Sequence, residues 1–217
     1  MTVKDGSFQP AFFDPLSTEH LTEIICQTLE RQPLFSMAEQ VPRFDGAGLY
    51  AIYYRGESVG EYTPLARTEI PLYAGQGASH NSATGRVKSS LRPVYLRLKA
   101  HRRSIDEGGL LVAEFEFRVL LMPDVHADLG EDGLRRLYQP VWNSVLTGFG
   151  SHEQGAATRQ SGRSKWDTFH AGRARSFGDS DHSIDELERL VAAHIDQQLV
   201  HYPDLPWPHP VRDLPGS

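Results

Sequence analysis

The stretch GLYAIYY, residues 48–54, reads as a β-strand from which the rest of the fold can be worked out. Its residues are mostly aromatic or aliphatic, and turn-forming residues bound it. A second short strand, PLYAG at 71–75, follows a polar stretch that we expect to form a loop or a hairpin extension. Each strand holds a tyrosine closely followed by small residues, Tyr50 and Tyr73. Strand tyrosines usually serve packing alone, so neither residue is specific by itself.

Periodic patterns predict the remaining elements. Four helices are expected, at residues 17–29, 93–104, 126–138 and 183–199. Ser17 and Ser183 can cap the first and the last of them. A third strand is expected within 110–121, where apolar and charged residues alternate, and residues 148–177 form a long loop-like stretch. This order predicts an α+β fold with a small mixed or antiparallel sheet of three strands, flanked by helices.

The composition is that of an ordinary globular chain. Its 217 residues are 39% hydrophobic and 23% charged, and a chain of this length suits one compact domain. Cys26 is the single cysteine, which excludes an intramolecular disulfide and reads as a small buried thiol. No signal-peptide pattern follows Met1, and no apolar run reaches the roughly 18 residues needed to span a bilayer. We therefore expect a cytoplasmic location.

The charge is unevenly distributed. The net charge of −6 taken alone argues against a nucleic-acid partner. Residues 85–105, however, carry seven lysines and arginines and no acidic residue, and a second basic stretch spans 159–175. Phosphates respond to the local surface within a Debye length of roughly 8 Å, so these stretches allow nucleic-acid binding. The alternative is that they are simply solvated faces.

Three side chains stand out on the predicted helices. His101 falls on the apolar stripe of its helix, and Arg97, one turn earlier, is its neighbour. Glu131 points where the apolar neighbours of its own helix point. A lone histidine is usually a hydrogen-bonded core residue, and an acid in the first turn of a helix is usually solvated near the helix dipole. Arg97 is harder to dismiss, because arginine is rarely buried without a partner anion.

Together these residues resemble the GIY-YIG nuclease family. Gly48-Leu49-Tyr50 is similar to its GIY motif and Tyr73-Ala74-Gly75 to its YIG motif. The helix with Arg97 and His101, a strand, the helix with Glu131 and then PVWN at 140–143 follow in the family's order. The resemblance is closest to the restriction endonucleases that cut CCGCGG sites. It extends over about residues 35–175 through GFGSHEQG and through SKWDTFHAGR, which spans 164–173.

The resemblance implies an enzyme and its domain arrangement. It implies a bacterial type II restriction endonuclease that hydrolyses double-stranded DNA at a GC-rich palindrome and leaves a 5′-phosphate and a 3′-hydroxyl. Residues 1–45 would form an N-terminal helical extension and 46–147 the catalytic core. Residues 148–217 would add a basic DNA-binding loop and a C-terminal helix to one compact domain. One departure is Gln76, where relatives often have lysine.

The resemblance also assigns roles to individual residues. The implied catalytic residues are Tyr50, Tyr73, Arg97, His101, Glu131 and Asn143. Glu131 would hold one Mg²⁺ or Mn²⁺ ion, and Arg97 would pair with the scissile phosphate. Tyr50 would orient or deprotonate the attacking water, with His101 hydrogen-bonded to it as proton acceptor. Tyr73 would position the water or a phosphate oxygen, and Asn143 would buttress the site.

Contacts with DNA and with partner proteins are expected as well. Arginine forks suit guanine edges, which fits a GC-rich site, although some basic residues must touch only phosphate. The candidates for DNA contact are Gln76, Arg86, Lys88, Arg102, Arg159, Arg163, Lys165, Arg173 and Arg175. A palindrome cut on both strands suggests a homodimer or a pair of dimers, working alongside a cognate DNA methyltransferase.

Three alternatives stay open at this point. A repair or homing nuclease of the same family normally attaches the module to separate DNA-binding domains, for which this chain has no room. A non-catalytic DNA-binding protein would not need the tyrosines, the arginine, the histidine and the acid together. A histidine-ligated metal hydrolase would need paired histidines at helical spacing, and the ten histidines do not form that pattern.

Overall fold

The structure is a computed structural model of the whole chain. It describes residues 17–80, 84–87, 90–150, 162–173 and 178–207. The predicted α+β class is confirmed, but the sheet has four strands instead of three, all antiparallel, in the order β1-β4-β2-β3. The strands are β1 (Phe35–Ser36), β2 (Gly48–Tyr54), β3 (Tyr73–Gly77) and β4 (Phe115–Leu121).

The additional strand is β1, which pairs Phe35 with Phe117 at the outer edge of β4. Two residues are too few to show a period, so no sequence pattern marked this strand. At the centre of the sheet, β2 pairs with β4 and β3 and has every residue buried. A strand buried on both faces reads as a continuous apolar run, which is the pattern of GLYAIYY.

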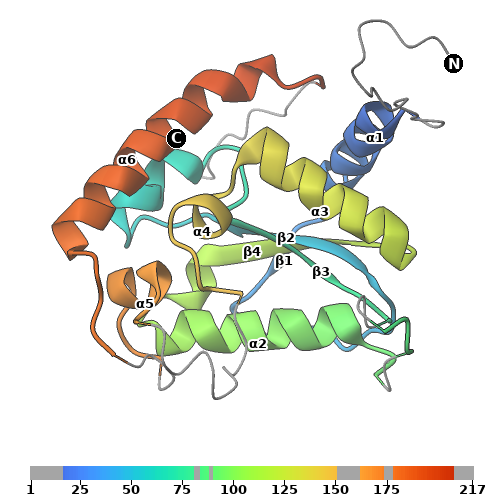
Figure 1. Cartoon of the computed structure of the whole chain (residues 1–217), viewed down its shortest axis with the longest axis horizontal. Helices are drawn as coiled ribbons and strands as arrows, with labels where there is room; N and C mark the ends of the chain where they lie inside the picture. The colour runs from blue at the N-terminus through green and yellow to red at the C-terminus, as the bar shows by residue number, and fades with distance from the viewer. Residues whose placement is uncertain (1–16, 81–83, 88–89, 151–161, 174–177, 208–217) are drawn as a thin grey trace, which may run out of the picture.

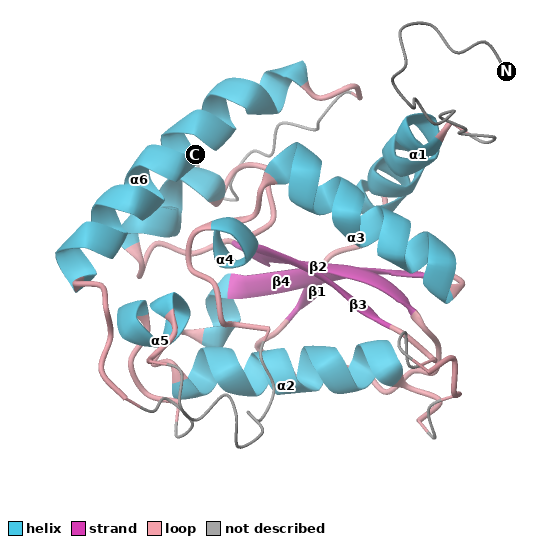
Figure 2. Ribbon diagram, in the orientation of Figure 1, coloured by secondary structure: helices cyan, strands magenta, loops and turns pink. Residues whose placement is uncertain are grey.

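Helices cover both faces of the sheet (Figures 1 and 2). Helix α2 (Pro93–Glu107) packs against β2 and β3 from one side, and α3 (Asp124–Tyr138) packs against the same strands from the other. Helix α1 (Thr18–Glu30) contacts α3 and β4, and α6 (Ile184–His201) contacts α4 and α5. No helix in the described part of the chain is long and apolar enough to cross a membrane.

Several short helices were not predicted. These are α4 (Val141–Ser144), α5 (Lys165–Phe169) and the 3-10 helices η1 (Gly60–Leu65), η2 (Val112–Glu114) and η4 (Tyr202–Asp204). The expected loop at 148–177 therefore contains a helix. Ser164 caps α5 by accepting a hydrogen bond from the Asp167 backbone amide, and Ser183 caps α6 in the same way through Glu186. Ser17, in contrast, precedes α1 without a side-chain cap, which corrects the expectation.

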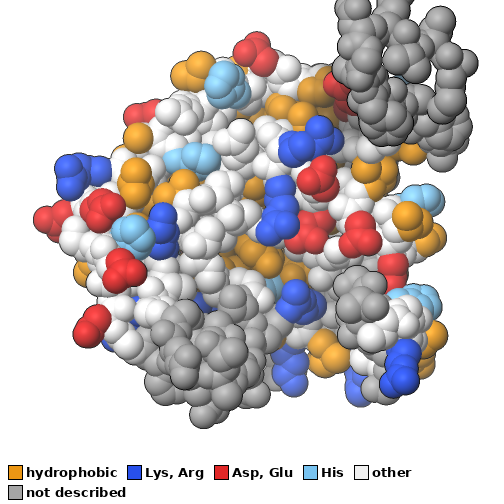
Figure 3. All heavy atoms as spheres, viewed as in Figure 1, with side chains coloured by type: hydrophobic (Ala, Val, Ile, Leu, Met, Phe, Trp, Pro, Cys, Tyr) orange, Lys and Arg blue, Asp and Glu red, His pale blue; other side chains and the backbone are white. Residues whose placement is uncertain are grey.

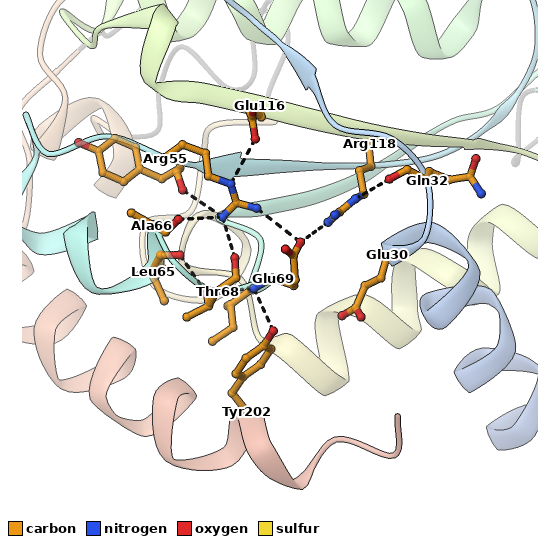
Figure 4. A network of polar contacts seen from close by, with 12 residues as sticks. Glu30, Gln32, Arg55, Leu65, Ala66, Thr68, Glu69, Glu116, Arg118 and Tyr202 are labelled. Carbon is orange, nitrogen blue, oxygen red and sulfur yellow. Dashed lines mark hydrogen bonds and ion pairs between the residues drawn. The ribbon is translucent and has the colours of Figure 1, made fainter. Parts of the chain in front are cut away.

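The predicted buried faces need two corrections. The helical apolar spacing of Leu21, Ile24, Ile25 and Leu29 predicts the buried stripe of α1, but the side chains buried there include Thr22 and Cys26, and Ile24 is 47% exposed. In β4 the expected alternation fails at Arg118, which is 2% exposed. Arg118 is buried because it pairs with the fully buried Glu69 and donates to the Gln32 carbonyl at 2.9 Å (Figure 4). A buried arginine requires such a partner, and the partner lies far away in the sequence.

Candidate active site

The pairing of β2 with β3 brings the two motif tyrosines onto one face of the sheet. Tyr50 lies opposite Gly75, and Tyr73 lies opposite Ile52, so the two rings are diagonal neighbours with centroids 6.2 Å apart. Gly75 leaves the space that both rings occupy. A Cβ there would come within 2.6 Å of the Tyr50 hydroxyl oxygen and 2.9 Å of Tyr73 Cε1. A glycine at the end of the second motif is therefore a steric requirement.

Helix α2 adds His101 to the tyrosine pair. The Tyr50 hydroxyl and His101 Nε2 are 2.7 Å apart, so the expected hydrogen bond is present. Both residues have no exposed surface, whereas Tyr73 is 7% exposed. Burial raises the pKa of Tyr50 well above its ordinary value, and the neighbouring Tyr73 adds to this rise. Burial also raises the pKa of Tyr73, so both phenols keep their protons at neutral pH.

A cavity of about 310 Å³ opens beside Tyr73. Its lining includes Tyr73, Arg97, Glu131, Arg135 and Asn143, which come from β3, α2, α3 and α4. Figure 3 shows acidic and basic side chains next to one another over the neighbouring surface of α3. Residues scattered over about seventy positions thus border one space large enough for a phosphate and its solvent. Tyr50 and His101 are not part of that lining in the described residues.

Asn143 fixes the edge of this cavity. Its amide nitrogen donates to the Ala74 carbonyl at 3.0 Å, and its side-chain oxygen accepts from the Ala74 amide at 2.8 Å. The Trp142 backbone amide donates to the Leu72 carbonyl at 2.9 Å. Because β3 is an edge strand, these bonds satisfy backbone groups that no further strand pairs with. Asn143 therefore ties α4 to the edge of β3.

Glu131 lies half-buried among polar partners. Arg135 Nη1 is 3.9 Å from Glu131 Oε1, one helical turn away. Burial raises the pKa of Glu131. The positive charges of Arg135 and Arg97 and a hydrogen bond with the Gln76 side chain act to lower this pKa. Gln76 also donates to Asp128, so its amide lies between two carboxylates on α3. Arg135 is exposed, and its i+4 spacing from Glu131 is the sequence signal that indicates this contact.

The donor set at Glu131 fits a divalent ion that is held mainly by oxygen. No group of three or more His, Cys, Asp or Glu residues able to hold a metal occurs among the described residues, so no all-protein cage is formed there. One carboxylate, completed by waters and phosphate oxygens, matches how Mg²⁺ is usually bound. Gln76 Oε1 is a further buried oxygen near Glu131, and it accepts no hydrogen bond in the described structure.

The expected DNA contacts include residues on the surface and residues outside the described part of the chain. Arg86 and Arg163 are exposed and Lys165 is half-exposed at the start of α5. Lys88, Arg159 and Arg175 lie outside the described residues.

Two of the expected contacts have partners within the protein, and one of these two, Arg173, needs correction. Arg102 is half-buried and donates to the carbonyls of Met37 and Ala38 at 2.8 and 3.2 Å, so it holds the chain before β2. Arg173 is 2% exposed and paired with Asp167, so it belongs to the core and cannot reach DNA in this structure. Sequence reasoning also missed Phe149, whose ring stacks on His101.

The antiparallel sheet that carries the tyrosine pair, with an arginine helix and a carboxylate helix meeting beside it, is the arrangement of a GIY-YIG nuclease. Residues 42–199 match the family described as the Eco29kI GIY-YIG domain, and the chain belongs to this family of type II restriction endonucleases. No curated protein matches the chain in a direct sequence comparison. Membership makes the protein an endonuclease with DNA as substrate, in a class that typically uses a divalent metal.

Proposed function

We propose that the protein is a type II restriction endonuclease that hydrolyses both strands of double-stranded DNA at a GC-rich palindromic site. The products carry a 5′-phosphate and a 3′-hydroxyl, and the metal is Mg²⁺, with Mn²⁺ as a substitute. The observation that supports this most is the common cavity of Tyr73, Arg97 and Glu131, with the Tyr50–His101 pair directly behind it. A phosphodiester placed there would meet a hydroxyl, a guanidinium and a carboxylate.

The arginines stabilise the charge on the phosphate. Arg97 is half-buried at the cavity wall, where its fork of donors pairs with the non-bridging phosphate oxygens. Arg135 offers a second guanidinium from the opposite helix. Mg²⁺ bound by Glu131 would supply the Lewis acid that such a hydrolysis needs. Arg97 and Glu131 are partly buried, and charge pairing there is stronger than in water, whereas Arg135 is exposed to solvent.

The attacking water gives up its proton through the tyrosines. Tyr73 borders the cavity and therefore holds the water, while Tyr50 lies deeper and links Tyr73 to His101. Since both tyrosines have raised pKa values, they act as neutral hydroxyls that pass the proton on to His101 Nε2. The water oxygen forms a bond to phosphorus, the bond between phosphorus and the 3′-oxygen breaks, and the departing 3′-oxygen takes a proton from solvent water in the cavity. A neutral histidine is a suitable acceptor near neutral pH.

Recognition and assembly complete the proposal. The exposed Arg86 and Arg163 and the half-exposed Lys165 contact DNA, and arginine forks read guanine in the major groove. A two-fold homodimer, alone or paired into a tetramer, cuts both strands of a palindrome. A cognate methyltransferase protects the host sites. Residues 46–147 form the catalytic core, with 1–45 and 148–217 as its extensions.

Cleavage of plasmid DNA tests the proposal. The purified protein is incubated with Mg²⁺ and plasmid, in parallel with Glu131→Gln and Asp132→Asn. Asp132 is the matched control, because it is exposed on the same helix and pairs with Arg136 outside the cavity. Discrete fragments from the wild type and from Asp132→Asn, but none from Glu131→Gln, are expected. DNA binding without cleavage by the wild type would favour a non-catalytic protein instead, and end-labelling checks the product polarity.

A further inference from the structure

The segment 164–173, which the resemblance links to DNA recognition, lies against the loop that carries Phe149. Arg173 Nη1 donates to the Phe149 carbonyl and Nη2 to the Gly148 carbonyl, each at 3.2 Å. The same guanidinium pairs through Nε with Asp167, whose other oxygen accepts from the Ser164 hydroxyl at 2.6 Å. One buried arginine therefore holds two consecutive backbone carbonyls of the loop. We call Ser164, Asp167 and Arg173 the clasp.

The clasp is itself held in place. The Arg173 guanidinium lies 4.2 Å from the centre of the Trp166 ring, a cation–π contact. The Trp166 backbone amide donates to the Thr147 carbonyl at 3.1 Å, just before the loop. Buried charges are stable only when they are paired and hydrogen-bonded, and both conditions are met for Arg173 and Asp167.

Phe149 fills the space between the clasp and the tyrosine–histidine pair. Its ring is fully buried and stacks on His101 with centroids 4.6 Å apart and planes 18° apart. It meets Tyr73 edge-on at 5.0 Å, and Trp142 and Trp166 pack against it at 4.3 and 5.2 Å. The face of the imidazole is thus covered by a flat apolar ring.

The glycines on either side of Phe149 shape the loop to this position. Gly148 has φ of +111°, a conformation that residues with a side chain rarely adopt, and a Cβ there would lie 2.3 Å from Ser164 Cβ. A Cβ on Gly150 would lie 2.4 Å from the Tyr73 hydroxyl oxygen. The loop therefore passes between the clasp and Tyr73 so closely that neither Gly148 nor Gly150 could carry a side chain without a clash.

We propose that Phe149 is a positioning residue for His101, and that the clasp positions Phe149. The proposal rests on the proposed nuclease function of the Tyr50–His101 pair. Stacking fixes the plane of the imidazole so that Nε2 stays aimed at the Tyr50 hydroxyl, 2.7 Å away. The same ring keeps water off the imidazole face, so the proton reaches His101 through Tyr50 rather than through solvent. The clasp thus supports catalysis from a distance.

The first test compares Phe149→Leu with Phe169→Leu. Both changes remove one phenyl ring from the aromatic cluster, but Phe169 packs on Tyr62 and His170 and makes no ring contact with His101 among the described residues. For Phe149→Leu we expect the single-turnover cleavage rate to fall roughly 10- to 100-fold while the affinity for DNA stays within about twofold, as for a loss of catalytic geometry. Phe169→Leu keeps the wild-type rate, and thermal melting confirms that both variants are folded.

A second variant tests the clasp without touching the aromatic ring. Arg173→Lys keeps the charge but replaces a planar fork, whose three nitrogens each reach a different acceptor, with a single nitrogen that cannot occupy all three positions. It should lower the rate in the same way as Phe149→Leu, and the double variant should be no slower than the slower single one. A double variant whose rate loss equals the product of the two single losses would show that the clasp does not act through Phe149.

A spectroscopic readout separates this inference from the proposed function. In protein labelled with ¹⁵N-histidine, the His101 ring signals, assigned with a His101→Gln variant, should shift or broaden in Phe149→Leu and stay unchanged in Phe169→Leu. Wild-type rates and unchanged His101 signals in Phe149→Leu would overturn the inference while leaving the nuclease standing. If the wild type cleaves no DNA, the nuclease proposal fails, and the signals still decide whether Phe149 holds the imidazole.

Discussion

At the scale of single residues, the site differs from a simple acid–base pair because its phenols are buried. Burial raises the pKa of Tyr50 and of Tyr73, so even less phenolate is present at neutral pH than in a free tyrosine. The tyrosines instead contribute oriented hydroxyl groups, because Tyr73 borders the cavity and Tyr50 is hydrogen-bonded to His101. Arg97 and Arg135 supply the charge that the phenols do not.

The two neighbouring arginines on α3 offer a matched test. Arg135 borders the cavity beside Glu131, whereas Arg136, the next residue, pairs with Asp132 on the exposed side of the helix. Arg135→Ala should lower kcat/KM for DNA cleavage about 10- to 100-fold, because a hydrogen bond to a charged group is worth roughly 1.5–3 kcal/mol. Arg136→Ala should leave it nearly unchanged. Equal losses in steady-state cleavage assays would mean that both act only through general attraction of DNA.

Gln76 should tune the metal site rather than contact DNA. Its amide lies between Asp128 and Glu131, so it orients the proposed metal ligand. Removing such a supporting hydrogen bond typically weakens metal affinity by about 10- to 100-fold, and we expect Gln76→Ala to weaken Mn²⁺ binding within that range. Electron paramagnetic resonance of free Mn²⁺ measures this directly, without a cleavage assay. If the Mn²⁺ affinity is unchanged and DNA binding is weaker, Gln76 contacts DNA and does not support the metal site.

At the scale of elements, the sequence predicted the helices and strands that show a periodic pattern or a continuous run of apolar residues. Helices α2, α3 and α6 and strands β2 and β4 show such patterns, and helical spacing placed Arg97 beside His101. Strand β1 and helices α4 and α5 are two to five residues long, too short for a period. Contacts between distant parts of the chain determine where these short elements form.

Two arginines show why tertiary pairing is not readable from one sequence. Arg118 looked like the exposed face of a strand, but it is buried because Glu69, 49 positions away, pairs with it. Arg173 looked like a DNA contact, but its carbonyl acceptors are 24 and 25 positions away on the Phe149 loop. Local spacing located the helices that carry Arg97 and Glu131, whereas partners at these separations follow only from the folded chain.

The junction between β3 and α3 should respond to acid. Asp124, the first residue of α3, accepts hydrogen bonds from the backbone amides of Ser79 and His80 at 3.0 and 2.9 Å. Partial burial acts to raise its pKa, but these bonds outweigh burial and lower the pKa to about 2. Because the folded pKa lies below the unfolded value, the carboxylate stabilises the fold above about pH 4, and this contribution is lost as the pH falls through about 2.

Urea unfolding of Asp124→Asn at two pH values checks this. At pH 6 the variant should be less stable than the wild type by on the order of 1 kcal/mol. At pH 3 the difference should be smaller, because the unfolded wild-type residue is then largely protonated. If the difference in unfolding free energy is the same at both pH values, the negative charge of Asp124 does not stabilise the fold.

At the scale of the whole molecule, a buried polar network joins segments that are distant in the chain. Glu69 pairs with Arg118 from β4 and with Arg55 at 3.4 Å, and its backbone amide donates to the Tyr202 hydroxyl at 3.0 Å (Figure 4). Glu30, the last residue of α1, lies close to this network and accepts from Trp207 Nε1 at 2.8 Å. Ion pairs and hydrogen bonds of this buried network therefore bring together α1, the sheet and the segment after α6.

Glu30 should make the stability of the whole fold depend on pH. Burial raises its pKa to about 8, and nearby Glu69 adds to the rise against the opposing effects of Trp207 and Arg118. Since the folded pKa exceeds the unfolded one, the folded protein holds a proton that the unfolded chain releases. Stability should therefore be greatest below about pH 4.5 for this group and fall by a few kcal/mol as the pH rises to about 8.

Replacing Glu30 with glutamine removes this titration while keeping an oxygen that accepts from Trp207. Glu30→Gln should match the wild type at pH 5 and exceed it at pH 8, where the wild type must either ionise a buried carboxyl or hold its proton at a cost. Glu19→Gln, an exposed change in the first turn of the same helix, is the control and should leave the pH dependence intact. Urea unfolding followed by tryptophan fluorescence measures all three proteins. If Glu30→Gln falls in stability between pH 5 and pH 8 as steeply as the wild type, a group other than Glu30 causes the pH dependence.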